Sequence, residues 1–256
     1  MSAHTYRHHV PAELDETRSH TTLVCLPPAT THEPDRLEAR IGARIARHTA
    51  GVPASVCPNH FTASPRLTAR ELALLINPHP ARVGLLRCVG GPIGLLDFTT
   101  FAALTEDVAA DLHSDWEQAV HGTPPAAPWR AFLDLADTEN PDSRDAAVED
   151  FFAQPRVAAI THHMGTGAVL TDLREYGAAL EAHQHSPAAY TAHLKATVQY
   201  GDALITERGQ LLTPGPVPRP PIDHTLAERS AYFVAAWSHL SGLDPNTVVV
   251  AAECQL

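Results

Sequence analysis

Two adjacent histidines, His162 and His163, are the most prominent candidates for chemistry in the chain. They lie in the stretch 155–181, which has the apolar spacing of a helix and contains no Asp, Glu or Lys between positions 157 and 171. A helix that is apolar on both sides is normally central in its domain. The sequence therefore predicts one long central helix that carries two imidazoles in its apolar half.

Haem iron commonly takes an imidazole as its axial ligand. Gly165 and Gly167 follow the histidine pair, and each costs about 1 kcal/mol relative to Ala in a helix. That cost is understandable if a flat macrocycle must lie close to the backbone. His163 is the better placed ligand, because Gly167 lies one turn further along its face, and His162 stays open as the alternative. Both could instead be core histidines bonded to backbone carbonyls.

A second candidate is the loop Cys57-Pro58-Asn59-His60-Phe61. A histidine between an amide and an aromatic ring, flanked by prolines, is held more rigidly than one in a tail. Because its unperturbed pKa lies near 6.5, His60 could transfer a proton close to neutral pH. The alternative is a histidine that caps the next helix or is exposed.

The segment Asp97-Phe98-Thr99-Thr100-Phe101 precedes a predicted long helix. Two aromatic rings and two hydroxyls at a helix start could line a small aromatic pocket, with Phe98, Thr99 and Phe101 as its walls. The same residues would also fit a helix cap followed by core phenylalanines.

Two further histidine groups could form a non-haem iron or zinc site. His113 and Asp115 form an H-x-D pair that would need a second, remote histidine to complete a facial triad. Residues two apart on a helix point away from each other, which weighs against this pair. His183, His185 and His193 have spacing that could hold zinc, but the chain has no H-E-x-x-H motif and these histidines fall where two helices should join.

The distribution of apolar residues predicts a mostly α protein. Six or seven helices and two or three short strands are expected, with residues 1–19 as an N-terminal arm and residues 20–256 as a single helical domain. That domain would contain the long central helix and a small mixed α/β N-terminal section. The expected strands include residues 20–27 and a terminal strand at 246–252, and residues 90–94 are expected to form a turn. The expected helices include one that Pro187 opens and that runs to Glu207, and a last one at residues 225–241.

Composition narrows the function classes. The chain has 256 residues, 18 basic against 29 acidic side chains and a net charge of −11, which argues against nucleic acid or an anionic membrane surface as partner. No apolar run reaches the roughly 20 residues needed to span a bilayer, and the N-terminus lacks a hydrophobic signal core. A cytoplasmic protein is expected.

Three segments together resemble one family. P-N-H in an early loop, D-F-T-T-F before a long helix, and T-H-H-M-G-T-G in a small-residue helix are similar to segments of the histidine-ligated haem-dependent aromatic oxygenases. The resemblance implies a non-covalent haem b with His163 or His162 as axial ligand and His60 as distal histidine. It places Asn59 and the 98–101 segment around the substrate.

The activity implied is hydroxylation of an aromatic amino acid such as tyrosine, in a bacterial natural-product pathway. A small aromatic substrate and dioxygen or peroxide are the expected partners, and a homodimer is one open assembly. Two alternatives remain, namely a non-haem iron or zinc enzyme that uses His113 and Asp115, and a non-catalytic helical binding protein.

Overall fold

The structure, a computed structural model, describes residues 20–28, 34–48, 55–57, 60–64, 66–81, 85–136, 141–163, 177–215 and 223–254. The helices in these ranges are α1 (Pro34–Ile45), α2 (Ala69–Leu72), η2 (Ile93–Leu95), α3 (Phe98–Ala119), α4 (Trp129–Leu133), α5 (Pro141–Ala153), α6 (Pro155–His163), α8 (Gly177–His185), α9 (Pro187–Tyr200) and α10 (Leu226–Ser241). The strands are β1 (His20–Leu26), β2 (Ser55–Val56), β3 (Phe61–Ala63), β4 (His79–Pro80), β5 (Leu86–Cys88), β6 (Gly90–Pro92), β7 (Ala203–Ile205), β8 (Leu211–Leu212) and β9 (Val248–Cys254).

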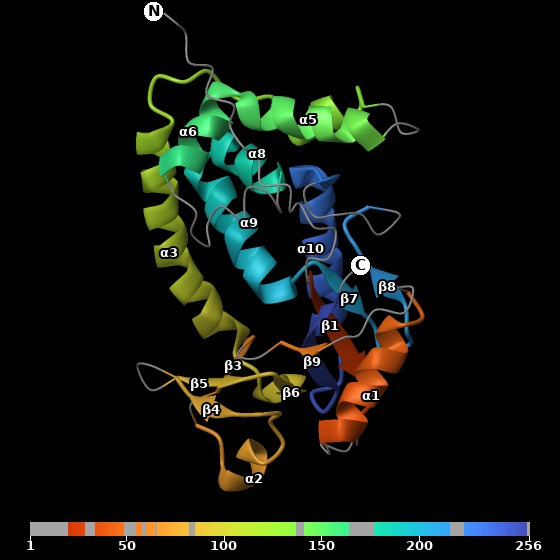
Figure 1. Cartoon of the computed structure of the whole chain (residues 1–256). Coiled ribbons are helices and arrows are strands. Elements are labelled where there is room, and N and C mark those ends of the chain that lie inside the picture. The colour runs from red at the N-terminus through yellow and green to blue at the C-terminus, as the bar shows by residue number, and fades with distance from the viewer. Residues whose placement is uncertain are drawn as a thin grey trace, which may run out of the picture.

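A mixed sheet built on β9 forms one half of the molecule (Figure 1). β9 pairs antiparallel with β1 along its whole length, so that Val24 lies opposite Val250. On its other side β9 pairs first with β2 and then with β6. β7 runs parallel to β1 and forms a hairpin with β8. β3, β5 and β4 make a separate antiparallel sheet of three strands.

Both faces of the mixed sheet are buried. Because successive side chains of a strand point to opposite faces, Leu23 and Val249 enter the apolar layer that includes α10, while Val24 and Val250 enter the layer that includes α1. A strand buried on both faces reads as a continuous apolar run, and the β-branched run of β9 has this character. The sequence patterns predicted both β1 and a terminal strand at β9.

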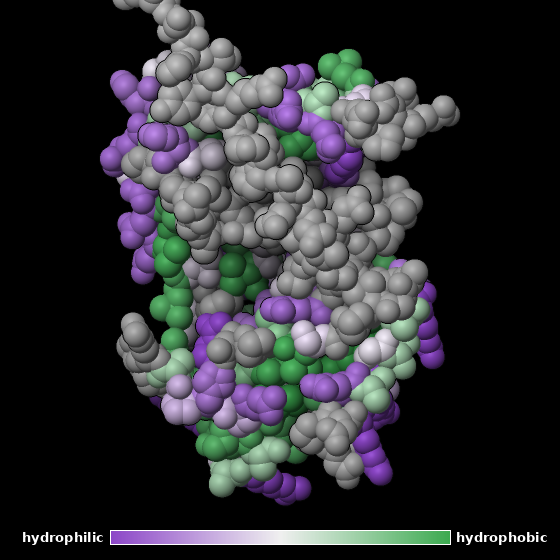
Figure 2. All heavy atoms as spheres, viewed as in Figure 1, coloured by the Kyte–Doolittle hydropathy of each residue, from purple (hydrophilic) through white to green (hydrophobic). Residues whose placement is uncertain are grey.

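Helices form the other half of the molecule. Figure 1 shows α3 and α9 leading away from the sheet toward α5, α6 and α8. An aromatic and aliphatic core joins these helices, and Trp116, Trp129 and Tyr190 are its largest fully buried side chains. Leu104 and Val108 of α3 are exposed, and the space-filling view shows apolar surface along the side of this helix (Figure 2).

The prediction of a mostly α protein is wrong. About 55% of the described residues are helical and 18% lie in strands, and the six-stranded sheet makes this a mixed α/β fold. A helix was expected to continue from Pro187 to Glu207, but α9 ends at Tyr200. Gly201 then takes a φ of 63°, which suits glycine, and its backbone turns the chain into β7. Strands of two or three residues are specified by their partners, which local patterns do not reveal.

The predicted central helix 155–181 lies only partly within the described residues. α6 covers its first nine residues and α8 begins at Gly177, whereas residues 164–176 lie outside the described part. The expected N-terminal arm, residues 1–19, also lies outside it. No helix among the described residues combines the length and apolar character that a bilayer crossing requires.

Candidate metal centre

α3 places two potential metal ligands on one side of the molecule. Ala109, His113, Trp116 and Val120 form its buried stripe, spaced as the inner face of an amphipathic helix. Glu117 lies one turn after His113, and residues four apart on a helix are neighbours. The Glu117 side chain is 59% exposed, so this carboxylate borders the stripe at the solvent edge.

α8 supplies the third ligand. Its buried residues are mostly small, and His183 is the one long polar side chain among them. α8 ends at His185, and Ser186 caps α9 directly, since its hydroxyl accepts the N–H of Ala189 at 3.1 Å and Pro187 occupies the first helical position. This tight corner folds α9 back along α8, so the Tyr190 ring lies 5.8 Å from that of His183.

The three side chains converge on one point. A ligand atom from each of His113, Glu117 and His183 lies within 4.8 Å of the others. The two imidazole centroids are 4.6 Å apart, and His183 Nε2 lies 3.4 Å from Glu117 Oε1. His113 Nε2 is buried without a hydrogen-bond partner within the described structure, and neither nitrogen of His183 makes a hydrogen bond of good geometry there, although the His113 backbone lies close to its ring. Buried polar atoms without partners are uncommon and require an explanation.

Electrostatics argue against a simple ion pair between His183 and Glu117. Burial lowers the pKa of His183 to about 4, with the His113 ring adding to this effect and Glu117 opposing it. His183 is therefore neutral at pH 7. A neutral imidazole has a free nitrogen lone pair, which is the form that binds a metal ion.

The spacing fits a transition-metal ion. Ligand atoms about 2.1 Å from a tetrahedral zinc ion lie about 3.4 Å from one another, which is the distance already found between His183 and Glu117. The exposed Glu117 side chain can rotate to close the remaining gaps. Two imidazoles and one carboxylate suit zinc or iron.

An open pocket of about 580 Å³ adjoins the three ligands. α3 contributes Ala110 and Ser114 to its wall, and the corner between α8 and α9 contributes residues 184–187 and Thr191. Three protein ligands leave at least one coordination position for water or substrate. The pocket gives that position access to solvent.

His60 and Phe98, two of the sequence-predicted site residues, lie in one aromatic cluster. The His60 ring is 4.7 Å from Phe61, and Phe61 is 5.9 Å from Phe98. Burial, reinforced by the Arg87 guanidinium, lowers the pKa of His60 to about 4, and its Nε2 has no hydrogen-bond partner among the described residues. Thr99 is exposed beside this cluster.

The structure does not bring His162 to this cluster. His60 directly precedes β3, near the start of α3, whereas His162 is an exposed residue of α6, and Figure 1 shows β3 and α6 toward opposite ends of α3. A helix of 22 residues spans roughly 33 Å. The side chains of His163 and Phe101, and all of Asn59, lie outside the described part of the structure.

Glu117 is the candidate ligand that the sequence patterns missed. The H-x-D pattern paired His113 with Asp115, which is exposed and points elsewhere. The useful signal was H-x-x-x-E, because positions four apart share a helix face. His193 does not join His183 either; it packs 5.9 Å from Phe233 in a different layer.

Comparison of the chain with protein-family models, with curated proteins and with solved structures found no significant match.

Proposed function

We propose that this protein is a metal-dependent enzyme with a single divalent transition-metal ion held by His113, Glu117 and His183. The observation that carries the proposal is the convergence of unpaired, buried imidazole nitrogens on one carboxylate. Burial of an unpaired polar atom is unfavourable, and a bound cation would give one nitrogen of each imidazole a partner.

The chemistry that fits this centre best is hydrolysis by an activated water. Two histidines and one glutamate are the ligand set of several catalytic zinc sites, and such sites lower the pKa of bound water to about 7. Ser114, Ser186 and Thr191 give the adjoining pocket hydroxyl groups, which suits a small polar substrate. His185 also lines the pocket and is the candidate proton acceptor.

Iron is the second candidate metal, because two histidines and one carboxylate also form the facial triad of non-haem iron oxygenases. With iron, the same centre would support the oxygenation expected from the family resemblance. Haem binding stays a separate prediction, and the distance between His60 and His162 does not favour a haem held between these two residues. A Soret band in protein supplied with haem would identify that case.

Metal content and activity of paired variants test the proposal. Protein loaded with zinc should bind one equivalent and should hydrolyse p-nitrophenyl acetate or p-nitrophenyl phosphate, and His183→Ala should lose both properties. His185→Ala is the matched control on the same helix: it should keep the metal, because His185 is exposed and outside the cluster. Zinc binding that survives in His183→Ala would contradict the proposed centre.

A further inference from the structure

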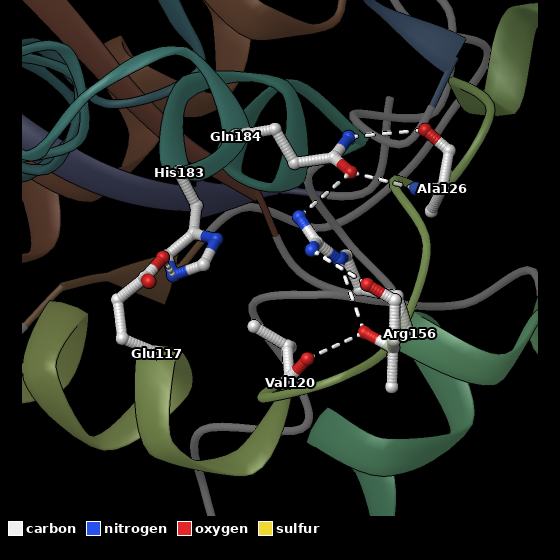
Figure 3. Close-up of polar contacts among 7 residues, drawn as sticks. Glu117, Val120, Ala126, Arg156, His183 and Gln184 are labelled. Atoms are coloured by element: carbon white, nitrogen blue, oxygen red, sulfur yellow. Dashed lines mark hydrogen bonds and ion pairs between the residues drawn. The ribbon is translucent and has the colours of Figure 1, made fainter.

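Gln184, the residue after His183, joins α8 to the turn that follows α3. Its Oε1 accepts the backbone N–H of Ala126 at 2.7 Å, and its Nε2 donates to the Ala126 carbonyl at 3.1 Å. Figure 3 shows this pair of bonds beside His183 and Glu117. One side chain thus satisfies both backbone groups of a residue in the segment that leaves α3.

Arg156 of α6 completes the connection (Figure 3). It donates to Gln184 Oε1 at 3.3 Å and to the Thr123 carbonyl at 3.1 Å. Thr123 in turn donates its hydroxyl to the carbonyl of Val120 at 2.7 Å, next to the last turn of α3. The ends of α3 and α8 are therefore tied together through side chains.

The buried side of α8 consists mostly of small residues, and a second tether among the described residues is Glu181, which accepts the N–H of Leu226 in α10 at 3.0 Å. Four of the six buried residues of α8 are small, namely Gly177, Ala178, Ala179 and Ala182. Small residues allow helices to approach closely but interlock little, so they resist rotation and sliding poorly. A metal centre requires ligand positions accurate to roughly 0.5 Å.

We infer that Gln184, supported by Arg156, is a positioning residue for the metal centre. The inference rests on the proposed function. Gln184 fixes the last turn of α8 against the end of α3 and so sets the approach of His183 to Glu117. Groups that hydrogen-bond directly to metal ligands typically contribute 10–100-fold to metal affinity, and Gln184 acts one step further away, through the backbone that carries His183.

The chain contains a matched control in Gln154. This residue makes the same two backbone bonds to the next residue of the turn, accepting from Ala127 N–H at 2.7 Å and donating to its carbonyl at 3.2 Å. It precedes α6 and does not adjoin a metal ligand. Gln154→Ala therefore removes the same kind of support from the same turn without touching His183.

The test compares cobalt(II)-loaded parent, Gln184→Ala, Gln154→Ala and Gln184→Glu, with affinity measured by chelator competition and coordination by visible absorption. Gln184→Ala should bind roughly tenfold or more weakly with an altered ligand-field band, while Gln154→Ala should match the parent. Gln184→Glu keeps the acceptor for Ala126 and Arg156, so it should fall closer to the parent than Gln184→Ala does. Arg156→Ala should move both readouts in the same direction and provides a second variant if Gln184→Ala does not fold.

The outcomes separate the two ideas. A parent protein that binds no cobalt would contradict the proposed function itself. A parent that binds cobalt, with Gln184→Ala and Arg156→Ala unchanged in affinity and spectrum, would overturn only the positioning role. Equal losses of cobalt affinity in Gln184→Ala and Gln154→Ala would also overturn the positioning role. Such a result would show that Gln184 only stabilises the turn after α3, as Gln154 does.

Discussion

At the scale of single residues, the proposed metal site depends on Glu117 and not on Asp115. Both are exposed acidic residues of α3 within one turn of His113, and only Glu117 lies within 4.8 Å of both imidazoles. Sequence inspection could identify His113 and His183 as candidates separately. It could not unite them, because their meeting depends on how α8 packs against α3.

We therefore expect Glu117→Ala to weaken zinc binding roughly tenfold or more, because it removes one of three ligands, and Asp115→Ala to leave it unchanged. Competition with a coloured chelator measures both affinities. Equal affinities in the two variants would show that the carboxylate of Glu117 is not a ligand.

At the scale of elements, the sequence predicted those helices and strands that carry a local signal such as a helix cap or a β-branched run. α10 was predicted from Thr225 onward, and the structure places a capping box there between Thr225 and Glu228. β1 was predicted from its apolar, β-branched run. β6 falls within residues 90–94, which were expected to form a turn, and its pairing with β9 is visible only in three dimensions.

Gly90 shows why a glycine is needed in that strand. A Cβ at this position would lie 2.1 Å from the Val249 carbonyl oxygen of β9, whereas a Cβ at Gly42 in α1 would meet nothing within 4 Å. Gly90→Ala should lower the free energy of unfolding by about 1–3 kcal/mol through backbone displacement. Gly42→Ala should raise it by about 1 kcal/mol, the usual helix preference for Ala.

Urea unfolding measured side by side tests this pair of glycine variants. An unchanged Gly90→Ala would contradict the close approach of β6 to β9, and a loss of stability in Gly42→Ala would contradict the open space around Gly42.

At the scale of the whole molecule, a buried ion pair joins the sheet to the helical half. Arg229 of α10 donates to Asp202 at 2.9 Å and to Thr197 of α9 at 3.2 Å, and Asp202 accepts the backbone N–H of Thr21 in β1. Breaking a buried pair leaves an uncompensated charge and is strongly destabilising. This junction fixes the sheet relative to α9 and α10.

Two buried histidines near this junction make the fold sensitive to acid. Burial, with Arg229 adding to it and Asp202 opposing, lowers the pKa of His193 to about 3, and burial with Arg87 lowers that of His60 to about 4. Below pH 6.5 the unfolded chain binds protons at these positions and the folded chain does not. Stability should therefore fall as the pH drops from 6.5 toward 4, by roughly 1.4 kcal/mol per pH unit for each histidine.

Urea unfolding of metal-free protein at pH 7, 6 and 5 measures this slope. His193→Gln cannot take up a proton at this position. The free energy of unfolding of this variant should therefore fall less steeply with decreasing pH than that of the parent, by about 1.4 kcal/mol per pH unit, which is the contribution of one histidine. The same decline in the parent and in His193→Gln would contradict the buried, neutral state of this histidine.

Anomalous X-ray scattering from crystals grown with zinc tests the proposed centre most directly. The account predicts one strong peak about 2.0–2.2 Å from His113, Glu117 and His183. A peak at other residues, or none between these three side chains, would contradict it.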